Sequence, residues 1–217
     1  MAEQHRKEHH HVPVWPWLTW PNRISLGRLL LVPVVILLLL YLDDWEPARR
    51  IALGVIAVMA VSDMVDGVLA RRLHKQTRLG AILDPLADKA LIISAVVLLS
   101  LPGSSVPSAR LPVWVVVAVV GKDLWVVIGF LVVYLVTDQF VVRPSAYGKA
   151  ATLVQLVMVV SVLAAPEFNR LDVADGQLGM TVARVLTAVA GGLSVLAAVS
   201  YTRMGLRFVV HQQKPME

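Results

Sequence analysis

Six apolar stretches, each long enough to cross a lipid bilayer, constrain the fold of this chain more than any other feature. Short breaks rich in Asp, Pro, Gly, Ser or Arg separate them. A helix of about 20 apolar residues spans a hydrocarbon layer of about 30 Å. The stretches therefore predict six transmembrane helices, over residues 24–42, 50–71, 80–101, 111–136, 147–165 and 181–201.

The composition agrees with a membrane protein. Of the 217 residues, 57% are hydrophobic and 16% are charged, which lies outside the usual range of soluble proteins. We expect an all-α, polytopic fold with one membrane domain over residues 21–205, between tails at residues 1–20 and 206–217. The absence of cysteine excludes disulfide and thiolate chemistry. The net charge of +5 is spread over the ends of the apolar stretches, so we expect anionic lipid headgroups and no nucleic acid as partners.

The distribution of Lys and Arg predicts the orientation in the membrane. Four of them flank the spans on one side: Arg49, Arg50, Arg110 and Arg170. Thirteen lie on the other side: Arg6, Lys7, Arg23, Arg28, Arg71, Arg72, Lys75, Arg78, Arg143, Lys149, Arg203, Arg207 and Lys214. The positive-inside rule then places both termini at the cytoplasmic face of the cell membrane. Three tryptophans within residues 14–20 predict an interfacial segment before the first span.

Four aspartates lie inside the apolar stretches or at their ends: Asp63, Asp66, Asp84 and Asp88. An ionised carboxylate at membrane depth costs about 2.5–3.5 kcal/mol or more, so the four need a partner. Oxygen ligands of this kind suit a hard divalent cation such as Mg2+. A structural ion-pair network and the ion pathway of a transporter are the alternatives. Transporter sites usually lie near the bilayer midplane, whereas these acids lie near cytoplasmic helix ends, which favours a phosphate-bearing substrate.

The aspartates form part of the pattern D-x2-D-G-x2-A-R-x8-G-x3-D-x3-D. Its fixed positions are Asp63, Asp66, Gly67, Ala70, Arg71, Gly80, Asp84 and Asp88. This pattern resembles the signature of the CDP-alcohol phosphotransferases, membrane enzymes that use a CDP-linked alcohol to make phospholipids. A looser resemblance extends from residue 21 to about residue 155 and includes the opening P-N-x-x-S-x-x-R-L, from Pro21 to Leu29.

The resemblance implies roles for the residues of this pattern. Two divalent ions, Mg2+ or Mn2+, would be held by Asp63, Asp66 and Asp84, with Asp88 contacting the second ion and acting as general base. The residues that would bind CDP-diacylglycerol are Asn22, Ser25, Asp63, Gly67, Ala70, Arg71 and Gly80. The small residues could instead be a helix-packing patch, and Asn22 and Ser25 could be simple helix caps.

A second element, P-S-x-x-G-K-x-x-T over residues 144–152, resembles members of the family that use glycerophosphate. It implies acceptor binding by Lys149, with Arg143, Lys122 and Arg78 as further candidates. Lys149 could instead be a snorkelling interfacial lysine, and Lys122 could form an ion pair with its neighbour Asp123.

The chain most resembles the phosphatidylglycerophosphate synthases of the family. The implied reaction moves the phosphatidyl group of CDP-diacylglycerol to sn-glycerol 3-phosphate and releases CMP, in an enzyme expected to be a homodimer. A CMP-forming cardiolipin synthase, which uses phosphatidylglycerol as acceptor, is the first alternative. A cation transporter is a remote one.

Overall fold

The structure is a computed structural model that describes residues 20–73, 80–106, 109–137, 145–171 and 177–212. Within these ranges the description does not extend to the side chains of residues 20–25, 63–73, 80–85, 130, 133, 134, 136, 137, 171 and 208–212. The described backbone forms six α-helices and no strand: α1 (Trp20–Leu40), α2 (Glu46–Leu73), α3 (Gly80–Leu98), α4 (Val113–Thr137), α5 (Ala146–Leu171) and α6 (Leu178–Gln212). The predicted all-α class is therefore confirmed for the described part of the chain.

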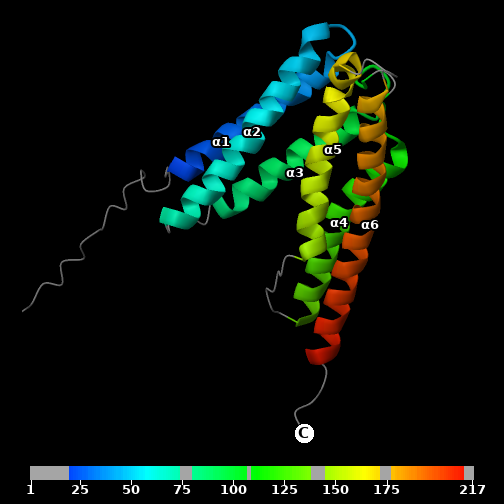
Figure 1. The fold of residues 1–217 in the computed structure, drawn as a ribbon. Helices are drawn as coiled ribbons and strands as arrows, with labels where there is room; N and C mark the ends of the chain where they lie inside the picture. Colours follow the sequence, from blue (N-terminus) through cyan, green and yellow to red (C-terminus); the bar gives the residue numbers. More distant parts are fainter. Residues whose placement is uncertain (1–19, 74–79, 107–108, 138–144, 172–176, 213–217) are drawn as a thin grey trace, which may run out of the picture.

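The helices are arranged in two groups of three, α1–α3 and α4–α6 (Figure 1). Helix α1 packs against α2 and α3, and α6 packs against α4 and α5. The groups meet where α1 turns into α2, α3 leads to α4 and α5 leads to α6, and they diverge toward the opposite end (Figure 1). We call the end where they meet the joined end. Smaller contacts of α5 with α2 and α3, and of α3 with α4, connect the two groups.

The hydrophobic core is densest toward the joined end. Leu39 near the end of α1, Leu99 just after α3 and Leu163 late in α5 are completely buried, as are Ile56 in α2 and Val115 early in α4. Van der Waals contacts among the side chains gathered here fill the space between the two groups. The diverging halves of the helices are held together less tightly, which leaves room for a cavity between them.

Two prolines lie inside helices although the sequence predicted breaks at them. Pro47 lies in the first turn of α2, where a missing backbone N–H costs no helical hydrogen bond. Pro166 lies inside α5, so this helix continues to Leu171 beyond the predicted boundary at residue 165. The predicted break that contains Gly103 is a turn. The φ of Gly103 is 89°, a backbone conformation that favours glycine.

Large apolar side chains cover much of the outer surface. Leu30, Val117 and Leu135, on α1 and α4, are each more than 60% exposed. In the described part of the chain, two helices are long and apolar enough to cross a bilayer, over Ala146–Arg170 and Leu178–Arg207. An exposed apolar surface of this extent suits a lipid environment better than water.

Ion pairs connect α2 and α5 at the joined end. The buried Arg49 donates hydrogen bonds from Nη1 to the backbone oxygen of Leu163, at 2.7 Å, and from Nη2 to Oε1 of Glu167. Arg50 Nε lies 2.9 Å from the same carboxylate oxygen. Arg170 is more exposed and lies 3.6 Å from both Glu46 and Glu167. Arg49 therefore links the first turn of α2 to the last turns of α5, and so one helix group to the other.

Replacing Arg49 should destabilise the fold more than replacing Arg170. Arg49→Leu removes two hydrogen bonds in a buried position, and hydrogen bonds to charged groups contribute about 1.5–3 kcal/mol. Arg170→Leu removes only exposed, longer contacts, which contribute about 0–1 kcal/mol. Thermal or denaturant unfolding in detergent micelles compares the two variants. Equal destabilisation would show that the buried contacts do not hold the two groups together.

Candidate functional site

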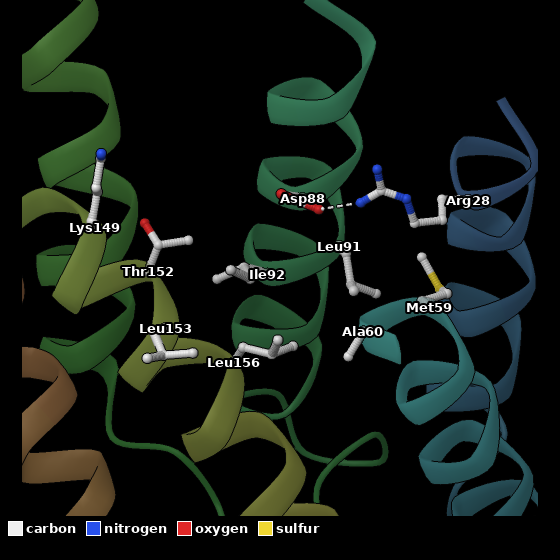
Figure 2. A pocket seen from close by; sticks show the side chains of 10 residues that line it. All are labelled: Arg28, Met59, Ala60, Asp88, Leu91, Ile92, Lys149, Thr152, Leu153 and Leu156. Carbon is white, nitrogen blue, oxygen red and sulfur yellow. Dashed lines mark hydrogen bonds and ion pairs between the residues drawn. The ribbon is translucent and has the colours of Figure 1, made fainter. Parts of the chain in front are cut away.

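A cavity of about 310 Å³ lies between the two helix groups. It is bounded by α1, α2 and α3 of the first group and by α5 of the second (Figure 2). Its lining residues are Arg28, Met59, Ala60, Asp88, Leu91, Ile92, Lys149, Thr152, Leu153 and Leu156. The cavity therefore combines three charged groups and a hydroxyl with an apolar wall, an arrangement that suits an amphipathic ligand.

Polar and apolar groups occupy different levels of this cavity. Figure 2 shows Asp88 on α3 between Arg28 on α1 and Lys149 on α5, with Leu153 and Leu156 below that level. Leu91 and Ile92 follow Asp88 by one turn of α3, so the polar and apolar parts of the wall share one helix face. A ligand with a charged head and an apolar body would fit with its head at the level of Asp88.

Asp88 forms an ion pair across the helix interface. Arg28 Nη1 donates a hydrogen bond to Asp88 Oδ1 at 3.0 Å. The arginine side chain is only 3% exposed, whereas the carboxylate is 42% exposed toward the cavity. The charge-assisted hydrogen bond from the buried guanidinium fixes the orientation of the carboxylate. Asp88 is thereby presented to the cavity as an oriented carboxylate.

The other three aspartates belong to helices that line the cavity. Asp63 and Asp66 follow Met59 and Ala60 in the unbroken helix α2 and continue their stripe at spacings of three, four and seven residues. Asp84 precedes Asp88 by one turn of α3. Their side chains lie outside the described residues, so the predicted four-carboxylate cluster stays a prediction. Carboxylate oxygens are the ligands that hard divalent cations prefer, so four carboxylates on two such stripes would suit a pair of these ions.

The predicted donor-binding residues are distributed over the same three helices. Asn22 and Ser25 lie in α1, Gly67, Ala70 and Arg71 in α2, and Gly80 begins α3. Their side chains are also outside the described part, so their contacts are not tested.

The predicted acceptor residues have different outcomes. Lys149, near the start of α5, is exposed and lines the same cavity as Asp88. Arg78 and Arg143 lie outside the described residues. Lys122, by contrast, is buried in α4 and does not line the cavity. Its Nζ lies 3.2 Å from Oδ1 of Asp123, so Lys122 forms the ion pair with its neighbour that was the alternative interpretation. A role of Lys122 in acceptor binding stays a prediction.

Sequence reasoning missed two ion-paired residues, one in this site and one beside it. Arg28 was part of the quoted opening pattern, yet no role was predicted for it. An arginine inside an apolar helix is itself a signal, because such a charge requires a partner. The second feature is Lys89, whose Nζ donates a hydrogen bond to Asp123 Oδ1 at 2.9 Å. Helix α3 is thus tied to α1 through Asp88 and to α4 through the next residue.

Comparison with known proteins identifies the family. The pattern of the CDP-alcohol phosphatidyltransferase family matches residues 18–196. The chain belongs to this family. It is 32% identical, over 87% of its length and 97% of the relative's, to a CDP-diacylglycerol--glycerol-3-phosphate 3-phosphatidyltransferase of Aquifex aeolicus. It is 35% identical to a probable phosphatidylglycerophosphate synthase of Mycobacterium tuberculosis, over 86% of this chain and 81% of that one.

A rat cardiolipin synthase (CMP-forming) is also similar, with 34% identity over 72% of this chain and 53% of the relative. Because the members of this family are phosphatidyltransferases, the chain is an enzyme. The resemblance found in the aspartate pattern is confirmed. Members of the family generally use divalent metal ions, in agreement with the oxygen ligands expected on α2 and α3.

Removing the guanidinium of Arg28 should lower turnover. Arg28→Met takes away the group that orients Asp88. Because that carboxylate is partly exposed, we expect a cost of about 1–2 kcal/mol, between the values for exposed pairs and buried pairs, or about 5- to 30-fold in kcat. Arg28→Lys should recover part of the loss, since it restores the charge without the planar fork. CMP release in detergent measures both.

Lys89→Met is the matched control, because it removes the neighbouring ion pair of α3, which lies outside the cavity. Its kcat should stay within about twofold of the wild type, as expected for a partly exposed pair. Full turnover in Arg28→Met, or an equal loss in Lys89→Met, would show that the contact with Asp88 has no special role.

Proposed function

We propose that this enzyme transfers the phosphatidyl group of CDP-diacylglycerol to sn-glycerol 3-phosphate and releases CMP. The observation that carries the proposal is the presence of Asp88 and Lys149 in one cavity, a carboxylate suited to accept a proton and a cation suited to bind a phosphate. The name of the Aquifex aeolicus relative gives the same donor and acceptor, and the relative from Mycobacterium tuberculosis is a probable phosphatidylglycerophosphate synthase.

The reaction is a phosphoryl-type transfer. A hydroxyl oxygen of the acceptor forms a bond to the phosphatidyl phosphorus of the donor's diphosphate. The bond from that phosphorus to the bridging oxygen breaks, and CMP leaves with the electron pair. Asp88 takes the proton of the attacking hydroxyl as general base, and Arg28 holds the carboxylate in place for this step. A covalent enzyme intermediate is not required.

Lys149 would bind the phosphate of the acceptor. It lies near the N-terminus of α5, where the helix dipole also favours an anion. The apolar wall formed by Leu91, Ile92, Leu153 and Leu156 suits the apolar part of the donor next to its headgroup. Acceptor and donor would then meet at the level of Asp88, with the acceptor on the α5 side.

We also propose that Asp63, Asp66, Asp84 and Asp88 hold two divalent ions, Mg2+ or Mn2+. Such ions would neutralise the diphosphate and stabilise CMP as it leaves. The support comes from the family, from the carboxylate chemistry, and from the helix stripes that continue from the cavity. Gly67 and Ala70 would leave space for the diphosphate beside the backbone of α2.

The six helices would each span the membrane, with both termini and the site at the cytoplasmic face. The antiparallel order of the helices and the positive charges at the diverging end support this topology. Membrane lipids would then surround the exposed apolar faces. The homodimer stays a prediction.

A cardiolipin synthase activity, with phosphatidylglycerol as acceptor, is the second candidate, favoured by the similarity to the rat enzyme. A cationic side chain in the cavity favours glycerol 3-phosphate, whose phosphate monoester carries more charge than the diester of phosphatidylglycerol. Family membership favours a transferase over the cation transporter.

An acceptor panel tests the proposal. Purified protein with labelled CDP-diacylglycerol and Mg2+ should convert glycerol 3-phosphate, and excess chelator should abolish turnover. Lys149→Ala should raise the KM for glycerol 3-phosphate at least about tenfold while the KM for CDP-diacylglycerol changes little, as expected when only acceptor binding is lost. Tyr147→Phe, an exposed change in the same turn, is the control. Conversion of phosphatidylglycerol but not of glycerol 3-phosphate would make the chain a cardiolipin synthase.

A further inference from the structure

The start of α5, which carries Lys149, contacts the far end of α6 through one side chain. The hydroxyl oxygen of Tyr201 in α6 accepts a hydrogen bond from the backbone N–H of Ser145, at 3.3 Å. Ser145 is 5% exposed and immediately precedes α5. The first N–H groups of a helix lack partners within it, so an acceptor from another helix defines where this helix begins.

Gly148 permits the close approach of Tyr201. A Cβ atom at this position would lie 3.0 Å from Cε2 and Cζ of the tyrosine ring and closer still to the hydroxyl oxygen. A glycine directly before a phosphate-binding lysine could be explained by a ligand that occupies the place of the missing side chain. Here the tyrosine occupies that space, so Gly148 serves the packing of α6 against α5.

A short series of hydrogen bonds leads from this contact to the cavity. Ser145 Oγ accepts a hydrogen bond from the N–H of Gly148 at 3.0 Å, the geometry of a helix N-cap. Thr152 Oγ1 donates one to the backbone oxygen of Gly148 at 3.1 Å. Thr152 lines the cavity together with Lys149, whereas Tyr201 does not line it. The tyrosine therefore acts on the cavity wall only through the backbone of the first two turns of α5.

We propose that Tyr201 is a positioning residue for the acceptor. It holds the first turn of α5 so that Lys149 and Thr152 face the cavity, and it does not contact the substrate itself. The inference rests on the proposed role of Lys149 in acceptor binding. It explains why the Ser and Gly of the P-S-x-x-G-K element accompany the lysine: Ser145 caps the helix, and Gly148 admits the tyrosine ring.

The test compares Tyr201→Phe with Thr202→Val. Tyr201→Phe keeps the ring and removes only the acceptor of the Ser145 hydrogen bond. Such a bond contributes about 0.5–1.5 kcal/mol, so the KM for the acceptor should rise about 2- to 10-fold. The KM for CDP-diacylglycerol should stay near that of the wild type, and the thermal midpoint should fall by at most about 6 °C. Thr202→Val removes a hydrogen bond of α6 to Trp125 of α4. It should leave both KM values unchanged.

Two further measurements keep the inference separate from folding and from the proposed function. Hydrogen exchange of residues 145–152 should become faster in Tyr201→Phe but not in Thr202→Val. Gly148→Ala should raise the acceptor KM more strongly, because its methyl group displaces the ring, and Gly148→Ala combined with Tyr201→Leu should recover part of that loss.

Unchanged exchange and an unchanged acceptor KM in Tyr201→Phe, alongside a raised acceptor KM in Lys149→Ala, would overturn the role of Tyr201 and leave the proposed function intact. An unchanged acceptor KM in Lys149→Ala would instead remove the proposed acceptor site, and with it the purpose assigned to Tyr201. The titrations use glycerol 3-phosphate or phosphatidylglycerol, whichever supports turnover.

Discussion

A charged side chain within an apolar helix bundle requires a partner, and this constraint selects which helices lie side by side. Arg28 of α1 pairs with Asp88 of α3, and Lys89 of α3 pairs with Asp123 of α4. Arg49 of α2 pairs with Glu167 of α5. Apolar packing is nearly indifferent to which leucine meets which, particularly where lipid is an equally good neighbour. The ion pairs are therefore contacts that specify how α1 to α5 are arranged.

The position of the cavity follows from the same contacts. The buried core and the contacts of Arg49 hold the two helix groups together at the joined end, and the groups separate toward the opposite end. Asp88 lies where α3 faces the resulting gap, and Lys149 lies across from it on α5. A polar headgroup can enter between the groups without breaking the packing at the joined end. Binding and stability are thus largely assigned to different ends of the molecule.

Much of the fold could be predicted from the sequence, because each helix is a continuous apolar stretch that ends at a short polar, proline or glycine break. The start of α3 at Gly80 was predicted correctly, and that of α5 to within one residue. The ends at Pro166 and in α6 were wrong, since a proline or a polar residue late in a helix can be tolerated when neighbouring helices support it. Local patterns do not say how far such support reaches.

The candidate site was predicted in its parts but not in its assembly. Asp88 and Lys149 were singled out by two separate motifs, and only the packing of α3 and α5 brings them to one cavity. The partner of Asp88 lies on another helix, so no spacing along the chain could reveal it. The pair of Lys122 with Asp123 joins two neighbours in the sequence and was one of the two interpretations drawn from it. Tyr201 lies outside every motif, and its contact with the first turn of α5 is purely tertiary.

In the proposed reaction Asp88, oriented by Arg28, would accept the proton of the attacking hydroxyl. Asp88→Asn keeps the shape of the side chain and removes its basicity. The most direct measurement is the kcat of CMP release together with the affinity for CDP-diacylglycerol. General-base catalysis contributes about 10²- to 10⁴-fold, so we expect a kcat at least about 100-fold lower with donor affinity largely retained. Turnover close to that of the wild type, or a loss of donor affinity as large as in Asp63→Asn, would contradict this role.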